Sequence, residues 1–206
     1  MASLGGGLPD TINYSLRLVL VTAALAWAWR WYIPLTGPKD TRFSIGYGAC
    51  YGVVGLALWI VLCAPFAPQG ASAWEPGPFF LRLAAAATIV PLAEELLLRG
   101  YVLRLAYQWD LRRKQSRDEA FHSALFEQTI GDVKEMKWSL PAVAISTVAF
   151  TLGHQPWEWP AAVVYGLLMC FLVVRRQDLI SCVVAHSVTN IGLAGYVYST
   201  GSWNLW

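Results

Sequence analysis

Long apolar runs separated by short polar breaks dominate this chain. They lie near residues 13–35, 45–66, 79–107, 139–155, 159–174 and 178–198. A helix needs about 20 apolar residues to cross a bilayer, so the pattern predicts about six transmembrane helices. The breaks between the last three runs are short but well marked, by Pro156 and Pro160 at one and by the polar run Arg175 to Asp178 at the next. We therefore expect a tight, all-α, polytopic helical bundle.

The composition agrees with a membrane location. The chain has 206 residues, of which 56% are hydrophobic and 14% are charged, and its mean hydropathy is +0.45. These values are typical of integral membrane proteins, and the length leaves room for one domain, which we expect to cover residues 1–206. The net charge of +2 is small, and the basic residues lie beside apolar runs, so we expect no nucleic-acid partner. The four cysteines lie in apolar runs without metal-ligand spacing, which indicates small core side chains.

The basic residues that flank the apolar runs gather in alternate loops. They are Lys39 and Arg42 after the first run, six residues from Arg112 to Lys137 after the third, and Arg175 and Arg176 after the fifth. Because cytoplasmic loops carry an excess of Lys and Arg, the alternation predicts six spans with both termini on the non-cytoplasmic side. The polar segment at about 108–138 would then be a cytoplasmic connector, forming either a short amphipathic helix on the membrane surface or a solvated link.

The third apolar run carries three charged residues, Glu94, Glu95 and Arg99. A charge at the centre of a membrane helix costs about 2.5–3.5 kcal/mol on insertion scales, so this cluster is a candidate functional site. Glu95 and Arg99 are four residues apart and should pair on one helix face. Glu94 lies about 100° around the helix and stays available for proton chemistry. Pro91 should kink this long helix beside the site, because it removes a backbone hydrogen bond.

Two further polar groups occur in the later runs. His154 ends the segment Phe150-Thr-Leu-Gly-His154, and His186 and Asn190 share one helix face in the last run. Each group alone has a structural explanation, because an intramembrane His or Asn often bonds neighbouring helices and a Glu–Arg pair can be a buried ion pair. A bundle does not need all of them merely to pack. Their conjunction favours a functional site.

This set of side chains suits hydrolysis. A carboxylate can deprotonate water while His and Asn side chains stabilise the oxyanion of an acyl-transfer intermediate. The set Glu94, His154 and His186 could instead hold a zinc ion, and spacing alone leaves that alternative open. The absence of an HExxH pair and of a serine in a nucleophile context disfavours soluble-type zinc or serine proteases. Proton-coupled transport is a third reading, disfavoured because no internal repeat is visible.

Three motifs carry a family resemblance. The segments Glu94-Glu95-x-x-x-Arg99, Phe150-x-x-x-His154 and His186-x-x-x-Asn190, in that order on separate hydrophobic helices, resemble the motifs of the CPBP family of intramembrane proteases. This family, also called Abi, comprises type II CAAX prenyl endopeptidases and bacteriocin-processing and self-immunity proteins. The resemblance covers about residues 79–198 and implies a CAAX-protease-like bundle of membrane helices.

The resemblance also implies a role for each motif residue. Glu94 would activate the hydrolytic water, and Glu95 and Arg99 would support the site. His154 would stabilise the oxyanion or place the water, and His186 with Asn190 would complete the pocket. It favours a metal-free, glutamate-activated mechanism, so we expect no cofactor and no metal, with zinc on Glu94, His154 and His186 as the alternative.

We accordingly expect an intramembrane endopeptidase that cleaves a membrane-anchored protein, either prenylated or C-terminally sorted. The chain is shorter than eukaryotic-type CAAX enzymes and resembles compact members found beside exosortase sorting systems in bacteria. The expected partners are therefore a membrane protein or lipidated peptide substrate, the lipid bilayer and an exosortase-type sorting system, in a bacterial inner (plasma) membrane. The alternative is a non-catalytic membrane partner on the same fold, serving bacteriocin immunity or protein sorting.

Overall fold

The protein is an all-helical bundle, as the sequence predicts. The computed structural model describes residues 10–115 and 119–206, and this part of the chain contains helices and no strand. The α-helices are α1 (Asp10–Ala28), α2 (Thr41–Cys63), α3 (Pro76–Ala87), α4 (Ile89–Glu95), α5 (Leu103–Gln115), α6 (Ala120–His122), α7 (Leu140–Leu152), α8 (Trp159–Arg176) and α9 (Ile180–Thr200). Two π-helical segments, η2 (Leu96–Val102) and η3 (Ser123–Glu127), and four 3-10 turns, η1 (Trp29–Trp31), η4 (Ile130–Asp132), η5 (Pro156–Glu158) and η6 (Trp203–Leu205), complete the order.

Within the described residues, three helices are long and apolar enough to cross a membrane. They are Thr41–Cys63, Pro156–Arg176 and Ile180–Thr200. Two shorter apolar helices cover Leu18–Trp31 and Leu140–Leu152. These five segments fall within five of the six predicted spans or close to them, whereas the exact count of six spans stays a prediction.

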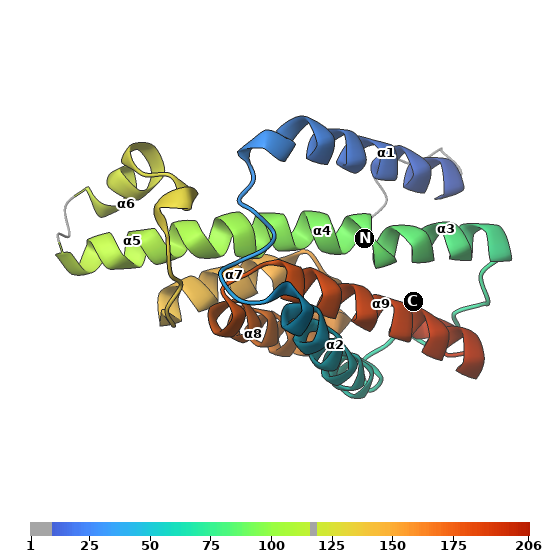
Figure 1. Cartoon of the computed structure of the whole chain (residues 1–206). Coiled ribbons are helices and arrows are strands. Elements are labelled where there is room, and N and C mark those ends of the chain that lie inside the picture. Colours follow the sequence, from blue (N-terminus) through green and yellow to red (C-terminus); the bar gives the residue numbers. More distant parts are fainter. Residues whose placement is uncertain (1–9, 116–118) are drawn as a thin grey trace.

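The third apolar run, expected as one helix over 79–107, is helical but interrupted. α3 ends at Ala87, and Thr88 leaves helical geometry with φ −130° and ψ −75° before α4 begins. Pro91 has no N–H to donate to the Ala87 carbonyl, and its ring crowds that oxygen, which explains the break one turn earlier. The helix is thus interrupted close to the place where the kink was predicted. Figure 1 shows α3, α4 and α5 lying end to end across the molecule, with α9 beneath α3 and α4.

Close contact between α2 and α9 forms one wall of the core. Gly48 and Gly52 of α2 face α9 so closely that a Cβ at either position would lie 2.6 Å from a backbone oxygen, that of Ser181 or Ala185. Thr189 Oγ1 bonds to Gly52 O at 2.8 Å across the same interface. Small residues let membrane helices approach at backbone distance, where packing and interhelical hydrogen bonds hold them. This contact fixes the helix that carries the last motif.

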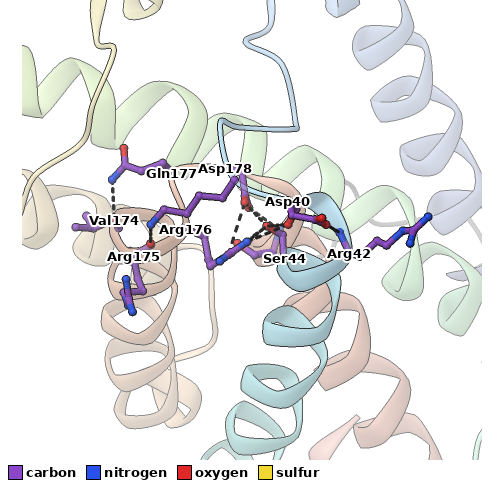
Figure 2. A network of polar contacts seen from close by, with 10 residues as sticks. Asp40, Arg42, Ser44, Val174, Arg175, Arg176, Gln177 and Asp178 are labelled. Atoms are coloured by element: carbon purple, nitrogen blue, oxygen red, sulfur yellow. Dashed lines mark hydrogen bonds and ion pairs between the residues drawn. The ribbon is translucent and has the colours of Figure 1, made fainter.

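A polar network fixes the start of α9 to the start of α2 (Figure 2). Arg176 Nη2 donates to Ser44 Oγ at 2.7 Å and to Asp40 O at 3.0 Å. Ser44 Oγ also bonds to the carboxylate of Asp178, and Asp178 Oδ1 accepts from Ser181 N at 3.0 Å, in the first turn of α9. Arg176 and Asp178 are thus buried charges with partners, and they set the register of α9 against α2.

The connector at 108–138 folds back along α5. Gln108 Nε2 donates to Thr129 O at 2.6 Å, and Arg104 Nη1 donates to Val133 O at 2.9 Å. The segment is therefore neither one amphipathic helix nor a free link, since its short helical pieces are tied to α5. Arg117 and Asp118, which the sequence places in this basic loop, lie outside the described residues.

Asp110 anchors the connector to the start of α7. Its carboxylate accepts from Lys114 at 2.7 Å, Ser139 at 2.8 Å and Arg113 at 2.9 Å. Burial alone would raise the pKa of Asp110, but the hydrogen bonds from Lys114, Ser139 and Arg113 outweigh it and lower that pKa to about 2. Ser139 also caps α7 by accepting from Ala142 N.

Candidate active site

A buried ion pair forms the base of the site. Glu95 Oε1 and Arg99 Nη1 are 3.2 Å apart, and both side chains are completely buried. The pairing expected from their spacing is confirmed. Arg99 also lies over the Phe150 ring, with 4.8 Å between its Cζ and the ring centroid, so the guanidinium is enclosed by a carboxylate on one side and an aromatic face on another.

The ion pair sits where the helix changes from α to π geometry. Glu95 is the last residue of α4, and Arg99 lies within the π segment η2. A π segment displaces backbone carbonyls from the regular ladder, and such segments occur often at functional sites. The Leu98 carbonyl accepts a hydrogen bond from Ser146 Oγ of α7 at 3.1 Å, so a side chain from another helix satisfies the altered backbone.

His186 lies between the two glutamates. Its Nδ1 is 3.0 Å from Glu95 Oε1, and its Nε2 is 4.0 Å from Glu94 Oε2. Because a carboxylate accepts, the Nδ1 atom carries the proton that bonds to Glu95, and Nε2 faces Glu94. Glu95 therefore fixes both the orientation and the tautomer of the imidazole.

The two glutamates differ in exposure. The Glu95 side chain is 0% exposed and the Glu94 side chain 28% exposed. One oxygen of each carboxylate, Oε2, is buried with no hydrogen-bond partner among the described residues, as are Nε and Nη2 of Arg99. Unpartnered buried polar atoms are costly, so their concentration here makes this cluster the candidate functional site.

An aromatic layer connects the second motif to this cluster. The Phe150 ring lies 4.5 Å from the His154 ring and 6.1 Å from the His186 ring, measured between centroids. His154 is half-buried against Trp59 of α2, and its Nδ1 donates to Phe150 O at 2.9 Å. His154 thus lies at the edge of the site, in the same layer as His186, and among the described residues it makes no hydrogen bond to either glutamate.

Asn190 lies one turn beyond His186 on α9. Its Nδ2 donates to Ala86 O at 2.7 Å, in the turn where α3 is interrupted. Asn190 therefore holds the broken part of α3 and α4 against α9. The six side chains predicted from the sequence all come to one region. Glu94, His186, Glu95 and Arg99 form a row of neighbouring side chains, and His154 and Asn190 lie at the edges of the region.

Three buried polar residues around the site were not predicted. Tyr165 Oη bonds to Thr189 Oγ1 at 3.1 Å, and the Tyr165 ring lies 5.6 Å from the His186 ring. Ser146 supports η2, as described above. The sequence offered helical spacing as a signal for two of them, since Thr189 is three residues after His186 and Ser146 is four residues before Phe150. This signal is weak, because a hydroxyl in an apolar run has many uses.

The donor set does not form a metal centre in this arrangement. Among the described residues, no group of three or more His, Cys, Asp or Glu side chains is placed to hold a metal ion. Glu94 and His186 approach each other, but His154 does not join them as a third ligand. In this arrangement the residues therefore fit a metal ion poorly.

Comparison with known proteins identifies the family. Neither the curated proteins nor the solved structures contain a match to this chain. A family model described as type II CAAX prenyl endopeptidase Rce1-like matches residues 76–192, which is more than half of the chain and includes all three motifs. The chain therefore belongs to the Rce1-like family of type II CAAX prenyl endopeptidases.

Proposed function

We propose that this chain is an intramembrane endopeptidase that hydrolyses a peptide bond by glutamate-activated water, with Glu94 as the general base. The position of His186 is the observation that carries this proposal. Its Nδ1 bonds to a glutamate neutralised by Arg99, and its Nε2 is directed at the more exposed glutamate. Two carboxylates in unlike environments on one helix suit two separate roles.

The proposed reaction begins with water beside Glu94. The carboxylate takes a proton from the water as its oxygen bonds to the scissile carbonyl carbon, and the carbonyl electron pair moves to oxygen to form a tetrahedral oxyanion. When this intermediate collapses, the carbon–nitrogen bond breaks and Glu94 returns the proton to the departing amine. The products are an amine and a carboxylic acid, which then gives its remaining proton to the amine or to water, and Glu94 is regenerated as a carboxylate.

The other motif residues would position the reacting groups and stabilise the oxyanion. Glu95 and Arg99 hold the imidazole of His186 beside Glu94 and are positioning residues. We assign His154 and the second N–H of Asn190 Nδ2 to stabilisation of the oxyanion, in keeping with their places at the edges of the site. The 4.0 Å separation of His186 Nε2 and Glu94 Oε2 is longer than a hydrogen bond, as expected before substrate is bound.

The substrate that we propose is a membrane-anchored protein, prenylated or C-terminally sorted, cleaved in a bacterial plasma membrane beside an exosortase-type sorting system. The family supports a membrane-embedded or lipidated substrate.

The proposal is tested by comparing Glu94→Gln with wild type in cleavage of prenylated peptides and membrane-protein C-terminal peptides. The amide cannot accept the water proton, so cleavage should fall by about 10²- to 10⁴-fold. Glu75→Gln is the matched control, because Glu75 is an exposed residue outside the site, and its activity should equal that of wild type. Each protein is assayed with and without a strong zinc chelator.

The outcomes separate the alternatives. Cleavage lost in Glu94→Gln but kept with chelator supports the base mechanism, whereas chelator-sensitive cleavage overturns it in favour of a metal. Full cleavage by Glu94→Gln removes Glu94 from the mechanism. A folded wild type that cleaves nothing in this library, together with a cellular phenotype that survives Glu94→Gln, overturns catalysis in favour of a non-catalytic immunity or sorting partner.

A further inference from the structure

A second candidate site lies at the basic end of the bundle, away from the glutamates. A groove of about 860 Å³ opens between the loop before α2, the segment before α7 and the last turns of α8. Lys39 Nζ donates to Arg175 O at 2.5 Å, and Met136 N donates to Gln177 Oε1 at 2.8 Å, so these three basic loops meet in space. The positive-inside rule places this end of the bundle at the cytoplasmic leaflet.

The groove has an excess of positive charge. Its lining includes four cations, Lys39, Lys134, Lys137 and Arg175, and one acid, Glu135. None of the four cations is in a salt bridge with any residue that the structure describes. Charges of one sign at the mouth of a groove create a field that attracts an anion.

The apolar side chains that α8 contributes to the groove lie nearer the middle of the helix than its arginine. Phe171, Val174 and Arg175 are spaced to share one face of α8, with the arginine nearest the helix end. Phe171 is 45% exposed and stacks on Tyr51 of α2, with ring centroids 6.2 Å apart. Trp138, another lining residue, is 52% exposed. From the helix interior to its end, the lining changes from aromatic and aliphatic to cationic.

Hydrogen bonds hold the turn at the end of α8 in place beside the groove. Gln177 adopts a left-handed conformation with φ 63° at the end of α8, and its Nε2 donates to Met136 O at 2.7 Å. On the other side of this turn, Arg176 extends into the buried network with Ser44, while Arg175 points away from it (Figure 2). One arginine is thus used to hold the turn and its neighbour is left for the groove.

We propose that this groove binds one anionic phospholipid of the cytoplasmic leaflet. The headgroup phosphate would lie among Lys134, Lys137 and Arg175, and an acyl chain would lie against Phe171 and Val174. Basic pockets at the cytoplasmic ends of membrane helices are suited to anionic headgroups. The order of the lining, apolar within and cationic at the end, matches that of a phospholipid and distinguishes it from a site for free phosphate.

The test is native mass spectrometry of the delipidated full chain in detergent. Phosphatidylglycerol, phosphatidylcholine and soluble glycerophosphate are each added at matched concentration. Wild type should retain one phosphatidylglycerol in preference to phosphatidylcholine and should not retain glycerophosphate. Removing one charge near a lipid headgroup should weaken retention by roughly fivefold, so Lys134→Gln with Lys137→Gln should weaken it by more than tenfold, and Arg175→Gln should act in the same direction.

Arg42→Gln is the matched control, because Arg42 is an exposed cation at the same end of the bundle but outside the groove. Its retention should stay within twofold of wild type. Equal loss in Arg42→Gln, or equal retention of both phospholipids, would overturn the proposal in favour of general surface attraction. Retention of glycerophosphate as tight as that of the lipid would overturn it in favour of a phosphate site.

Phe171→Ser tests the acyl-chain contact separately. This variant should weaken phosphatidylglycerol retention, and full retention would contradict the contact between the acyl chain and Phe171.

Discussion

At the scale of single residues, the ion pair of Glu95 and Arg99 shows how a costly group supports a site. Both side chains are fully buried, and one carboxylate oxygen and two guanidinium nitrogens have no partner among the described residues. Buried pairs of this kind gain little stability over apolar packing. The pair is better explained by what it holds, which is the imidazole of His186 at 3.0 Å.

We expect Arg99→Gln to destabilise the protein by about 3–5 kcal/mol, because it leaves the carboxylate of Glu95 buried without its counter-charge. The double variant Glu95→Gln with Arg99→Gln removes both charges and should recover part of this loss. The free energy of unfolding in detergent is measured for wild type, both single variants and the double variant. Losses that simply add would show that the two side chains do not interact energetically.

The residue scale also shows where sequence reasoning reached its limit. Spacing of four residues placed Glu95 with Arg99, and His186 with Asn190, on common faces. It gave no information on contacts between helices, so the link from His186 to Glu95 across 91 positions could only come from the fold. The bond from Asn190 to Ala86 O was equally hidden, since it depends on a carbonyl at an interrupted helix.

At the scale of elements, the long charged helix was predicted as one span with a kink, and the structure shows an interruption at Thr88. The π segment η2 could not be read from sequence, because it is sustained by contacts such as Ser146 to Leu98 O from another helix. The α2–α9 interface was also missed, although Gly48-x-x-x-Gly52 was visible and such spacing favours close helix contact. Glycine is common in membrane helices for several reasons, so the spacing becomes informative once its partner helix is known.

This interface gives a prediction with an internal control. Gly52→Ala puts a Cβ 2.6 Å from Ala185 O and 2.7 Å from Val188 Cβ, so α2 and α9 must separate. Overpacking of this kind costs about 1–3 kcal/mol. Gly46→Ala in the same helix meets no atom within 4 Å and should be neutral or stabilise by about 0.5–1 kcal/mol. Thermal unfolding midpoints of the two variants are compared, and equal midpoints would show that close approach is not required.

At the scale of the whole molecule, basic residues gather at one end of the bundle and the candidate site lies in its interior. The loops that carry Lys39, Lys137 and Arg175 are far apart in sequence but meet around one groove. Arg82, in the middle of α3, lies instead against Trp206, with Cζ 4.7 Å from the ring centroid. Composition and loop charge predicted a membrane bundle with a basic end, whereas the assembly of that end into a groove needed the tertiary contacts.

The alternation of basic residues among the loops predicts which loops face the cytoplasm. Ser72, in the exposed loop between α2 and α3, and Glu127, in the connector, lie in loops that the basic-residue pattern assigns to opposite sides of the membrane. Of the four cysteines, Cys50 alone is exposed and the others are buried, so Cys50→Ala gives a background with low labelling. In intact cells, a membrane-impermeant maleimide should label Ser72→Cys at once and Glu127→Cys only after permeabilisation. The reverse pattern would place the basic groove on the outer face, where the cytoplasmic leaflet could not supply its lipid.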